Sequence, residues 1–540
     1  MIDYWKMDHW LLLVLINGCI RACADKNLNQ TKDPHRSIIR ESDFESLIDW
    51  STSFNDKGEK MKRIVKKEDY IQSLKDLHHM VYYNGKRVED VTGHPALRPH
   101  INAAALTYEL ALRPEYEELM TATSHLTGKK INRFTHIHQS VDDLIKKVQM
   151  LRLIAHETGT CFQRCVGFDG LNAVYMTTYD VDQKYKKGYF ERLKQYLIHI
   201  QESNAMVVGG MTDPKGDRSL PPTKQSDPDL FTHVVERRPD GIVIRGAKAH
   251  QTGAVNSHEI LIMPTQAMRE DERDYALVCA LPLNAPGVIL IFGRQTNEER
   301  KFEEGIDIGN PEFGLVGGEA LVVFEDVFVP WERVFLCGEY DMAGILVERF
   351  ATLHRQNYGG CKGGVSDILI GASALAAEFQ GTANASHIKD KLADMIHLAE
   401  TIYAGSVACS AMGYKTPSGA YYPDPLLANT TKHNVTRHIY EIARLAHDIA
   451  GGIIATMPFQ GDLESSEVGH YVKKYLAGAK DVPVETRMKI LRLIENMSGG
   501  TALAESMHGA GSPQTQKVMY GRLGNLEQKK RWAKRLVGID

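Results

Sequence analysis

Apolar residues recur three and four positions apart between residues 68 and 203, for example in DYIQSLKDLHHMVYY and VDDLIKKVQMLRLIAHETGTC. This spacing is typical of amphipathic helices. From residue 204 to about residue 340 the period changes, and short apolar runs predict strands in HEILIMP, YALVCALP, GVILIFG and EALVVFEDVFVP. The segment HVVERRPDGIVIRGAKAH predicts a β-hairpin that turns at Pro239, Asp240 and Gly241.

Helical spacing returns after residue 341 in GVSDILIGASALAAEF, ASHIKDKLADMIHLAETIYAGSVACSAM, NVTRHIYEIARLAHDIAGGIIATM and ETRMKILRLIENMSGG. Their alanine and glycine content favours close packing in an antiparallel bundle. The sequence therefore predicts an α+β protein with a helical domain (61–203), a β domain (204–340) and a C-terminal helical bundle (341–540). Residues 1–60 are expected to form an extension outside the main fold, which would begin at Met61.

Composition narrows the class of partner. A chain of 540 residues can form two to four domains with sizeable cores, and its net charge of -4 gives no electrostatic reason to expect a nucleic-acid partner. The apolar run in WLLLVLINGC is too short to span a membrane, so no membrane partner is expected. Eight cysteines in a chain of this length do not suggest a disulfide framework, and reduced thiols in the cytoplasm are the better interpretation.

Two segments could supply metal ligands. CFQRC places Cys161 and Cys165 four positions apart, which on a helix would put both sulfurs on one face. HRQNYGGCKGG adds His354 and Cys361 on either side of an expected Tyr-Gly-Gly turn. Three cysteines and a histidine suit either zinc or a four-iron cluster, and the wide spacing leans toward iron and sulfur. Taken alone, the CFQRC pair is more often a pair of buried structural cysteines.

Other segments could bind a cofactor without a nucleotide-binding fold. No GxGxxG motif follows a strand and no Walker motif occurs. The turn in MTDPKGDRS, beside Lys215 and Arg218, could bind phosphate oxygens or could be a solvated surface turn. AKAHQTGAVNSHE, ESMHGAGSP and Glu319 at the start of an apolar strand carry further polar groups. Taken alone, the polar groups of each segment more often cap helices or stabilise turns than form a site.

Taken together and in order, CFQRC, MTDPKGDR, RGAKAHQTG, HRQNYGGCK, DIAGG and ESMHGAGSP closely resemble the 4-hydroxybutyryl-CoA dehydratases of the flavin-dependent 4-hydroxyphenylacetate 3-hydroxylase superfamily. The resemblance extends from about residue 61 to residue 540. It implies an acyl-CoA dehydrogenase-like fold, a homotetramer, and both FAD and a [4Fe-4S] cluster. The implied reactions are radical dehydration of 4-hydroxybutyryl-CoA to crotonyl-CoA and isomerisation of vinylacetyl-CoA to crotonyl-CoA.

The resemblance also implies roles for individual residues. The implied cluster ligands are Cys161, Cys165, His354 and Cys361. The implied flavin contacts are Met211, Thr212, Asp213, Pro214, Lys215, Gly216, Asp217, Arg218, His250, Gln251, Thr252, His508, Gly509, Ala510 and Gly511. Residues required for activity would be His354, Glu505, Tyr358, Lys362, Glu319, Gln163 and Thr252.

Among these residues, His354 and then Glu505 are the candidate bases, because an imidazole can accept a proton near neutral pH. Tyr358 and Lys362 would relay protons, and Glu319 would position substrate or flavin. Two other functions remain open. A flavin-dependent aromatic hydroxylase would lack the cluster, and a zinc-stabilised interaction protein would use the three cysteines and His354 only for structure.

Overall fold

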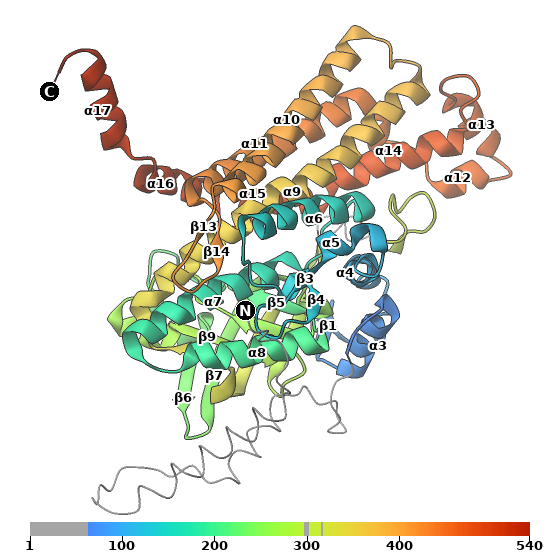
Figure 1. Cartoon of the computed structure of the whole chain (residues 1–540). Helices are drawn as coiled ribbons and strands as arrows, with labels where there is room; N and C mark the ends of the chain where they lie inside the picture. Colours follow the sequence, from blue (N-terminus) through green and yellow to red (C-terminus); the bar gives the residue numbers. More distant parts are fainter. Residues whose placement is uncertain (1–62, 296–301, 315–316, 540) are drawn as a thin grey trace, which may run out of the picture. The chain divides into compact units, whose positions relative to one another are not determined.

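The computed structural model of the protein describes residues 63–295, 302–314 and 317–539, which lie in one compact unit. The expected extension 1–60 and the expected start at Met61 lie outside these residues. Helices predominate in the first part of the described chain, strands in the middle and long helices in the last part (Figure 1). The mixed α and β class is therefore confirmed, while the division into three domains stays a prediction.

The first helical part is interrupted by short strands. Its helices are α3 (Lys67–Leu77), α4 (Arg98–Leu110), α5 (Glu117–Met120), α6 (Val141–Thr158), α7 (Cys165–Tyr185) and α8 (Tyr189–Ser203), and its strands are β1 (Val81–Tyr83), β2 (Lys86–Val88), β3 (Thr121–Thr123) and β4 (Lys130–Asn132). The helix predicted through DYIQSLKDLHHMVYY is wrong beyond Leu77. His78 adopts a left-handed φ of 47°, which ends α3. β1 then pairs in parallel with a strand about 200 residues away, a contact that local periodicity cannot reveal.

The described residues of the middle segment form eight strands; the six between residues 233 and 330 confirm the prediction, and the two at 207–210 and 334–337 were not predicted. The strands are β5 (Val207–Gly210), β6 (His233–Arg237), β7 (Gly241–Thr252), β8 (Glu259–Ile262), β9 (Leu277–Pro282), β10 (Val288–Phe292), β11 (Glu319–Pro330) and β12 (Val334–Cys337). β6 and β7 form the expected antiparallel hairpin. One sheet has the order β2-β1-β10-β11-β7-β6 and the other β12-β9-β8-β5.

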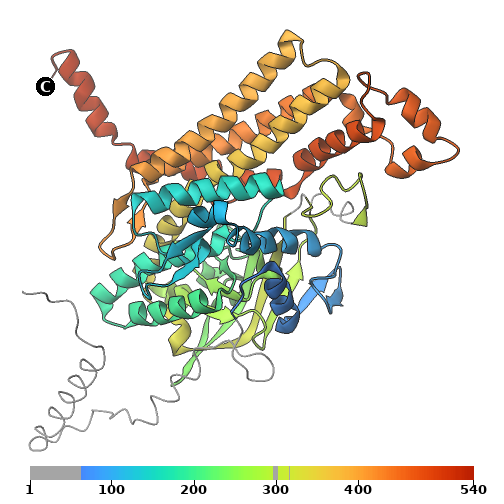
Figure 2. The ribbon, with the colours of Figure 1, turned by 45° about the vertical axis from the view of Figure 1, so that its right-hand side comes forward.

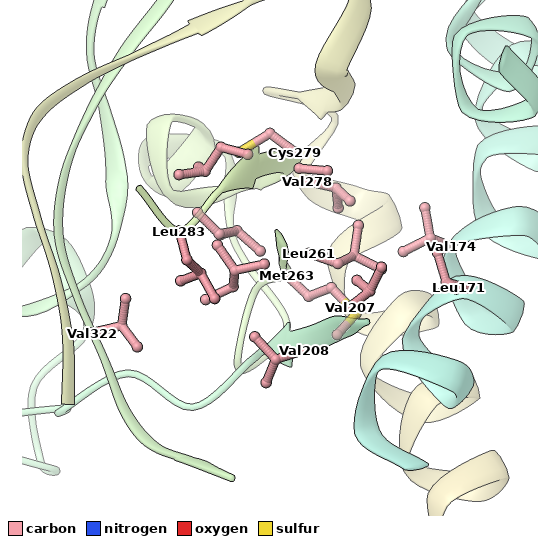
Figure 3. Packing of buried hydrophobic residues seen from close by; sticks show 14 of the residues in the cluster. Leu171, Val174, Val207, Val208, Leu261, Met263, Val278, Cys279, Leu283 and Val322 are labelled. Atoms are coloured by element: carbon pink, nitrogen blue, oxygen red, sulfur yellow. The ribbon is translucent and has the colours of Figure 1, made fainter. Parts of the chain in front are cut away.

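Helix α7 packs against the four-stranded sheet. Leu171 and Val174 of α7 face Val207 of β5 and Leu261 of β8 in a continuous apolar core (Figure 3). All four side chains are buried. Since Cys165 is the first residue of α7, this packing holds the CFQRC segment at the edge of the core.

The C-terminal part contains α9 (Tyr340–Gln380), α10 (Ser386–Ala411), α11 (Pro425–Ala450), α12 (Gln460–Glu464), α13 (Gly469–Tyr475), α14 (Val484–Gly499), α15 (Thr501–His508), α16 (Pro513–Leu523) and α17 (Leu526–Leu536), with a small hairpin of β13 (Tyr414–Lys415) and β14 (Tyr421–Tyr422). Helices α9, α10 and α11 lie side by side in both views, and α6 packs against α9 (Figures 1 and 2). Within the described ranges, no helix is long and apolar enough to cross a membrane.

The expected Tyr-Gly-Gly turn does not exist, because residues 354–364 lie in the middle of the 41-residue helix α9. Glycine disfavours a helix interior, but here it permits close helix packing. A Cβ on Gly360 would lie 2.5 Å from the carbonyl oxygen of Val148 in α6, and one on Gly364 would lie 2.6 Å from that of Arg152. These glycines therefore bring α9 against the backbone of α6.

Gly360→Ala should destabilise the protein by about 1–3 kcal/mol, the usual cost of overpacking a core. The new methyl group would meet backbone rather than a movable side chain. Gly371→Ala, in the same helix, is the control, since no atom lies within 4 Å of its Cβ position. That variant should gain up to about 1 kcal/mol from helix propensity. Thermal unfolding followed by circular dichroism measures both, and equal midpoints would contradict the packing argument.

Candidate active site

The three cysteines of the predicted ligand set come from two places. Cys161 lies in the connection between α6 and α7, Cys165 is the first residue of α7, and Cys361 belongs to α9. The expectation that Cys161 and Cys165 share a helix face is therefore wrong. Gln163 between them has a left-handed φ of 63°, which interrupts any helix. Cys165 and Cys361 nevertheless pack against the same apolar cluster.

The thiols are close enough to influence one another electrostatically. Burial raises the pKa of the Cys165 thiol well above its ordinary value, and negative charge on Cys161 and Cys361 raises it further. Burial also raises the pKa of Cys161, and it raises that of Cys361 to about 11. Thiolates at this place therefore need a compensating cation, which a metal centre supplies.

Within the described ranges, no group of three or more His, Cys, Asp or Glu side chains is gathered so as to hold a metal ion. Tetrahedral zinc would need its four ligands to converge on one point. The ligands of an iron–sulfur cluster bind different irons, so they can lie farther apart. The donor types and their shared burial fit a cluster better than a single ion.

His354 lies on α9, one turn before Tyr358, and is held in a fixed orientation. Its Nδ1 lies 2.8 Å from Oδ2 of Asp169 in α7, and its ring stacks on Phe350 with centroids 5.6 Å apart. A carboxylate on one imidazole nitrogen fixes the tautomer and leaves the other nitrogen free to bind a metal or a proton. The charge of Asp169 also raises the pKa of Cys165. The partner of His354 therefore lies close enough to the thiols to act on them electrostatically.

Asp169 is itself surrounded by donors. Lys147 of α6 donates to its Oδ1 at 2.5 Å, and the Asn357 side-chain amide donates to its Oδ2. Lys147 also donates to the Leu353 carbonyl oxygen at 3.1 Å. Lys147 and Asp169 are fully buried. Since their charges compensate each other, the pair can hold His354 in place inside the protein.

Tyr358, Lys362 and Glu505 lie beside the thiols. Lys362 donates to Oε1 of Glu505 at 2.7 Å, and to the carbonyl oxygen of Ala502 at 3.0 Å. Burial lowers the pKa of Lys362, but the charges of Glu505 and Cys361 outweigh it and raise that pKa above its ordinary value. Burial raises the pKa of Tyr358 well above its ordinary value, and the charge of Glu505 raises it further. Tyr358 is thus a neutral phenol beside a charged pair.

The predicted turn after α15 is confirmed, with left-handed φ values at Ala510 and Gly511. A Cβ on Gly509 would overlap the hydroxyl group of Tyr358, so a glycine there lets the turn close over the phenol. Arg355 of α9 donates to the carbonyl oxygen of Ala510 at 3.0 Å. The turn therefore belongs to the same group of residues as Tyr358 and Glu505.

Gln163, Thr252 and Glu319 form a second group at the ends of β7 and β11. The Thr252 hydroxyl donates to Oε1 of Glu319 at 3.0 Å. A Cβ on Gly318 would overlap the side-chain amide of Gln163, so that amide lies against the start of β11. Both polar atoms of the buried Gln163 side chain lack a partner within the part of the chain described. Glu319 raises the pKa of Cys161, which places this group near the thiols.

The loop 211–218 lies beside the end of β7. The backbone N–H of Met211 donates to Oε1 of Gln251 at 3.3 Å, and Ala249 N–H donates to the Thr212 carbonyl oxygen at 2.7 Å. Asp213 is buried and accepts a hydrogen bond from Lys248 at 2.8 Å, and this bond anchors the loop to β7. His250, Gln251 and Thr252 are the last residues of β7 and do not follow the strand as expected.

The turn 508–511 and the loop 211–218 are bonded to different elements. The turn is held by Arg355 and by Gln516, whose side-chain amide donates to the Gly511 carbonyl oxygen at 3.1 Å. The loop is held by β7 and by Gln225, which accepts from Asp217 N–H at 3.0 Å. The predicted flavin contacts are therefore held in place by two different sets of hydrogen bonds.

Sequence patterns did not reveal four buried residues of this region. Asp169, Asn357 and Lys432 contact predicted site residues, Lys147 contacts Asp169, and all four are almost completely excluded from solvent. The sequence could have indicated Asp169, because this carboxylate stands four residues after Cys165 in an otherwise apolar stretch, CVGFDGL. Each lysine lies in a segment that reads as an ordinary amphipathic helix.

Comparisons with known proteins agree on the family. Residues 66–336 match the family described as 4-hydroxyphenylacetate 3-hydroxylase N terminal, and residues 343–538 match the corresponding C-terminal family. The 4-hydroxybutyryl-CoA dehydratase/vinylacetyl-CoA-Delta-isomerase of Clostridium aminobutyricum is 54% identical over 486 residues, covering 87% of this chain and 99% of that protein. The oxygenase component of 4-hydroxyphenylacetate 3-monooxygenase from Thermus thermophilus is 27% identical, covering 80% of this chain and 87% of that protein.

Solved structures show the same relationship. The oxygen-tolerant archaeal 4-hydroxybutyryl-CoA dehydratase from N. maritimus aligns with a TM-score of 0.86 at 49% identity, covering 88% of this chain and 95% of that one. An oxygenase component of 4-hydroxyphenylacetate 3-monooxygenase in complex with FAD aligns with a TM-score of 0.78 at 25% identity, covering 87% and 98%. The chain therefore belongs to the 4-hydroxyphenylacetate 3-hydroxylase family and, within it, to the group of the 4-hydroxybutyryl-CoA dehydratases.

Proposed function

We propose that this protein dehydrates 4-hydroxybutyryl-CoA to crotonyl-CoA and isomerises vinylacetyl-CoA to crotonyl-CoA, using FAD and a [4Fe-4S] cluster. The similarity to the clostridial enzyme of that name, over 99% of its length, carries the proposal. The donor types of Cys161, Cys165, Cys361 and His354, three thiols and an imidazole, also support it. A hydroxylase of the same family would not need this set of ligands.

The four ligand residues suit a cluster by donor type and by surroundings. Burial raises the pKa of the three thiols, so they would bind as thiolates only beside a strong positive charge such as that of a cluster. Nδ1 of His354 lies within hydrogen-bond distance of Asp169, so Nε2 is the nitrogen that would bind iron. A histidine-bound iron is more easily opened to a substrate than a thiolate-bound one. We therefore assign Cys161, Cys165, His354 and Cys361 as the ligands.

The FAD assignment rests on the family and on unsatisfied polar atoms. A family member of known structure contains FAD. In this chain the buried Gln163 amide lacks a partner among the described residues, and a bound flavin or substrate could satisfy it. The assigned flavin contacts are the loop 211–218, the β7 end at His250, Gln251 and Thr252, and the turn 508–511.

The chemistry requires a proton to leave C3, which no carbonyl group acidifies directly. Bound FAD supplies reversible one-electron chemistry, and a bound cluster supplies a Lewis-acidic iron for the leaving hydroxyl group. The protein must then place bases at the substrate carbons, and His354 and Glu505 are the candidates. Tyr358 and Lys362 donate hydrogen bonds or relay protons beside them, while Glu319 positions substrate or flavin. His354, Tyr358 and Lys362 are buried, which would limit the access of water to the reaction.

Several coarser expectations accompany this function. The substrate would be an acyl-CoA thioester, which agrees with the name of the clostridial relative. The homotetramer, a cytoplasmic location and the acyl-CoA dehydrogenase-like arrangement of three domains remain proposals. They can be checked by size-exclusion chromatography with light scattering, cell fractionation and a crystal structure.

Anaerobic purification followed by incubation with 4-hydroxybutyryl-CoA tests the function. We expect a brown protein with bound FAD, acid-labile sulfide and formation of crotonyl-CoA, and loss of both colour and dehydration after exposure to oxygen. A colourless, inactive protein that contains zinc would instead support a structural site. Hydroxylation of 4-hydroxyphenylacetate with supplied reduced FAD, without dehydration, would favour the aromatic hydroxylase.

A further inference from the structure

Lys432 of α11 is a buried cation that no role above explains. Its side chain is fully excluded from solvent, and its Nζ lies 4.3 Å from the centroid of the Tyr358 ring. The ammonium group also donates to the carbonyl oxygen of Ser506, the residue after Glu505 in α15. Lys432 therefore connects three elements of the site, namely α9, α11 and α15.

Lys432 differs from the other lysines of this region in its partners. Lys362 is paired with Glu505, and Lys147 is paired with Asp169. Within the part of the chain that the structure describes, Lys432 forms no ion pair. An aromatic face and one carbonyl oxygen compensate a buried charge less than a carboxylate does. A lysine buried without a carboxylate partner, beside a candidate active site, is therefore a candidate for a functional role of its charge.

We propose that Lys432 is a positioning residue of the active site: it holds the Tyr358 ring and the α15 segment that carries Glu505 in one arrangement and supplies positive charge beside them. This inference rests on the proposed dehydratase function. The hydroxyl group of Tyr358 lies against Gly509, in the turn after α15, and Glu505 forms an ion pair with Lys362. A shift of α15 would therefore displace the base candidate and the phenol together.

The charge of Lys432 depends on pH within an accessible range. Burial lowers the pKa of Lys432 to about 7, and Lys362 and Arg355 lower it too, while Glu505 and Cys361 oppose the shift. Tyr358 is the other titratable side chain in contact with it. The ammonium form is present below this pKa and is lost as the pH rises through it. An arginine at the same place stays charged throughout.

Three substitutions separate charge from hydrogen bonding. Lys432→Gln keeps a donor for Ser506 without charge, Lys432→Met removes both, and Lys432→Arg keeps the charge. We expect kcat for 4-hydroxybutyryl-CoA dehydration to fall about 10–100-fold in the Gln and Met variants, with KM changed less than about threefold, since the transition state is affected more than binding. FAD and iron contents should equal those of the wild type.

Lys432→Arg should recover most of that loss and move the alkaline limb of the kcat profile to higher pH. The matched control is Lys391→Met, which removes a bundle lysine that pairs with Asp448 at 2.8 Å, away from the site. This control should leave kcat unchanged. Wild-type kcat in Lys432→Gln would overturn the role of the charge.

Amide hydrogen exchange of the purified holoproteins tests the positioning without any activity assay. Exchange in residues 501–511 should be faster in Lys432→Met than in the wild type, and unchanged in Lys391→Met. Unchanged exchange in Lys432→Met would overturn the inference even if the dehydratase function holds. A wild-type protein without dehydratase activity would instead contradict the proposed function, while the exchange result would still decide the positioning.

Discussion

Cys161→Ala is expected to lose the iron–sulfur absorbance and, with it, all detectable dehydration of 4-hydroxybutyryl-CoA. Cys161 lies on an irregular segment, and Gln163 beside it adopts a left-handed conformation. Another cysteine could replace Cys161 as a ligand only if the backbone before α7 changed its conformation. Three remaining ligands would leave one iron open to solvent and to loss.

This result requires a control, because removing any buried thiol can affect folding. Cys279 of β9 is fully buried in the sheet core, as Figure 3 shows, and lies outside the predicted ligand set. Cys279→Ala should keep the visible spectrum and the activity while losing some stability from the cavity it leaves. Iron and sulfide analyses, visible spectra and the anaerobic assay complete the comparison. A Cys161→Ala protein with full cluster absorbance and activity would falsify the ligand assignment.

Glu505→Gln is expected to lower kcat about 10²–10⁴-fold, the usual contribution of one positioned acid or base. The Glu505 carboxylate pairs with Lys362 and raises the pKa of both Lys362 and Tyr358. Glutamine keeps an acceptor for Lys362, so the local hydrogen bond survives while the capacity to take a proton is lost. FAD content, iron content and KM should therefore change little.

Glu485→Gln provides the matched control for this prediction. Glu485 lies in the neighbouring helix α14, where it pairs with Lys489 on the surface at 2.6 Å. Its loss should leave kcat at the wild-type value, because exposed ion pairs contribute little. If Glu505→Gln also retains wild-type kcat, Glu505 is not a base, and His354 stands as the remaining candidate.

The two outcomes bear on different parts of the proposal. Loss of the cluster in Cys161→Ala tests which residues bind the metal centre, whereas Glu505→Gln tests which residue transfers a proton after the cofactors are in place. A protein that needs Cys161 but not Glu505 would keep the dehydratase assignment with a revised set of bases. A protein that needs neither would bring the aromatic hydroxylase back into consideration.

Local patterns in the sequence predicted those features that depend on neighbouring residues. Short apolar runs identified β8 to β11, and Pro239, Asp240 and Gly241 identified the hairpin between β6 and β7. The turn after α15 was also predicted, because a glycine there permits left-handed backbone. Resemblance in six short segments led to the family, and the comparisons bear it out.

The same local reasoning failed where distant contacts override propensity. The glycines after Tyr358 read as a turn, yet α9 continues through them because its backbone packs directly on α6. The segment Val81–Tyr83 continues a helical period, yet it forms a strand because β10 offers it a pairing edge. Burial against another element supplied the energy that decided each case.

The sequence by itself determined most helices and strands, the mixed α and β class, the candidate ligands and the family. Only the tertiary structure decided that Asp169 orients His354, that Gly509 closes over Tyr358, and that Lys432 lies on the same phenol. These contacts join residues up to about 185 positions apart. Hydrophobic period and turn preference are local properties of the chain, whereas the pairing of buried polar groups depends on which surfaces the folded core brings together.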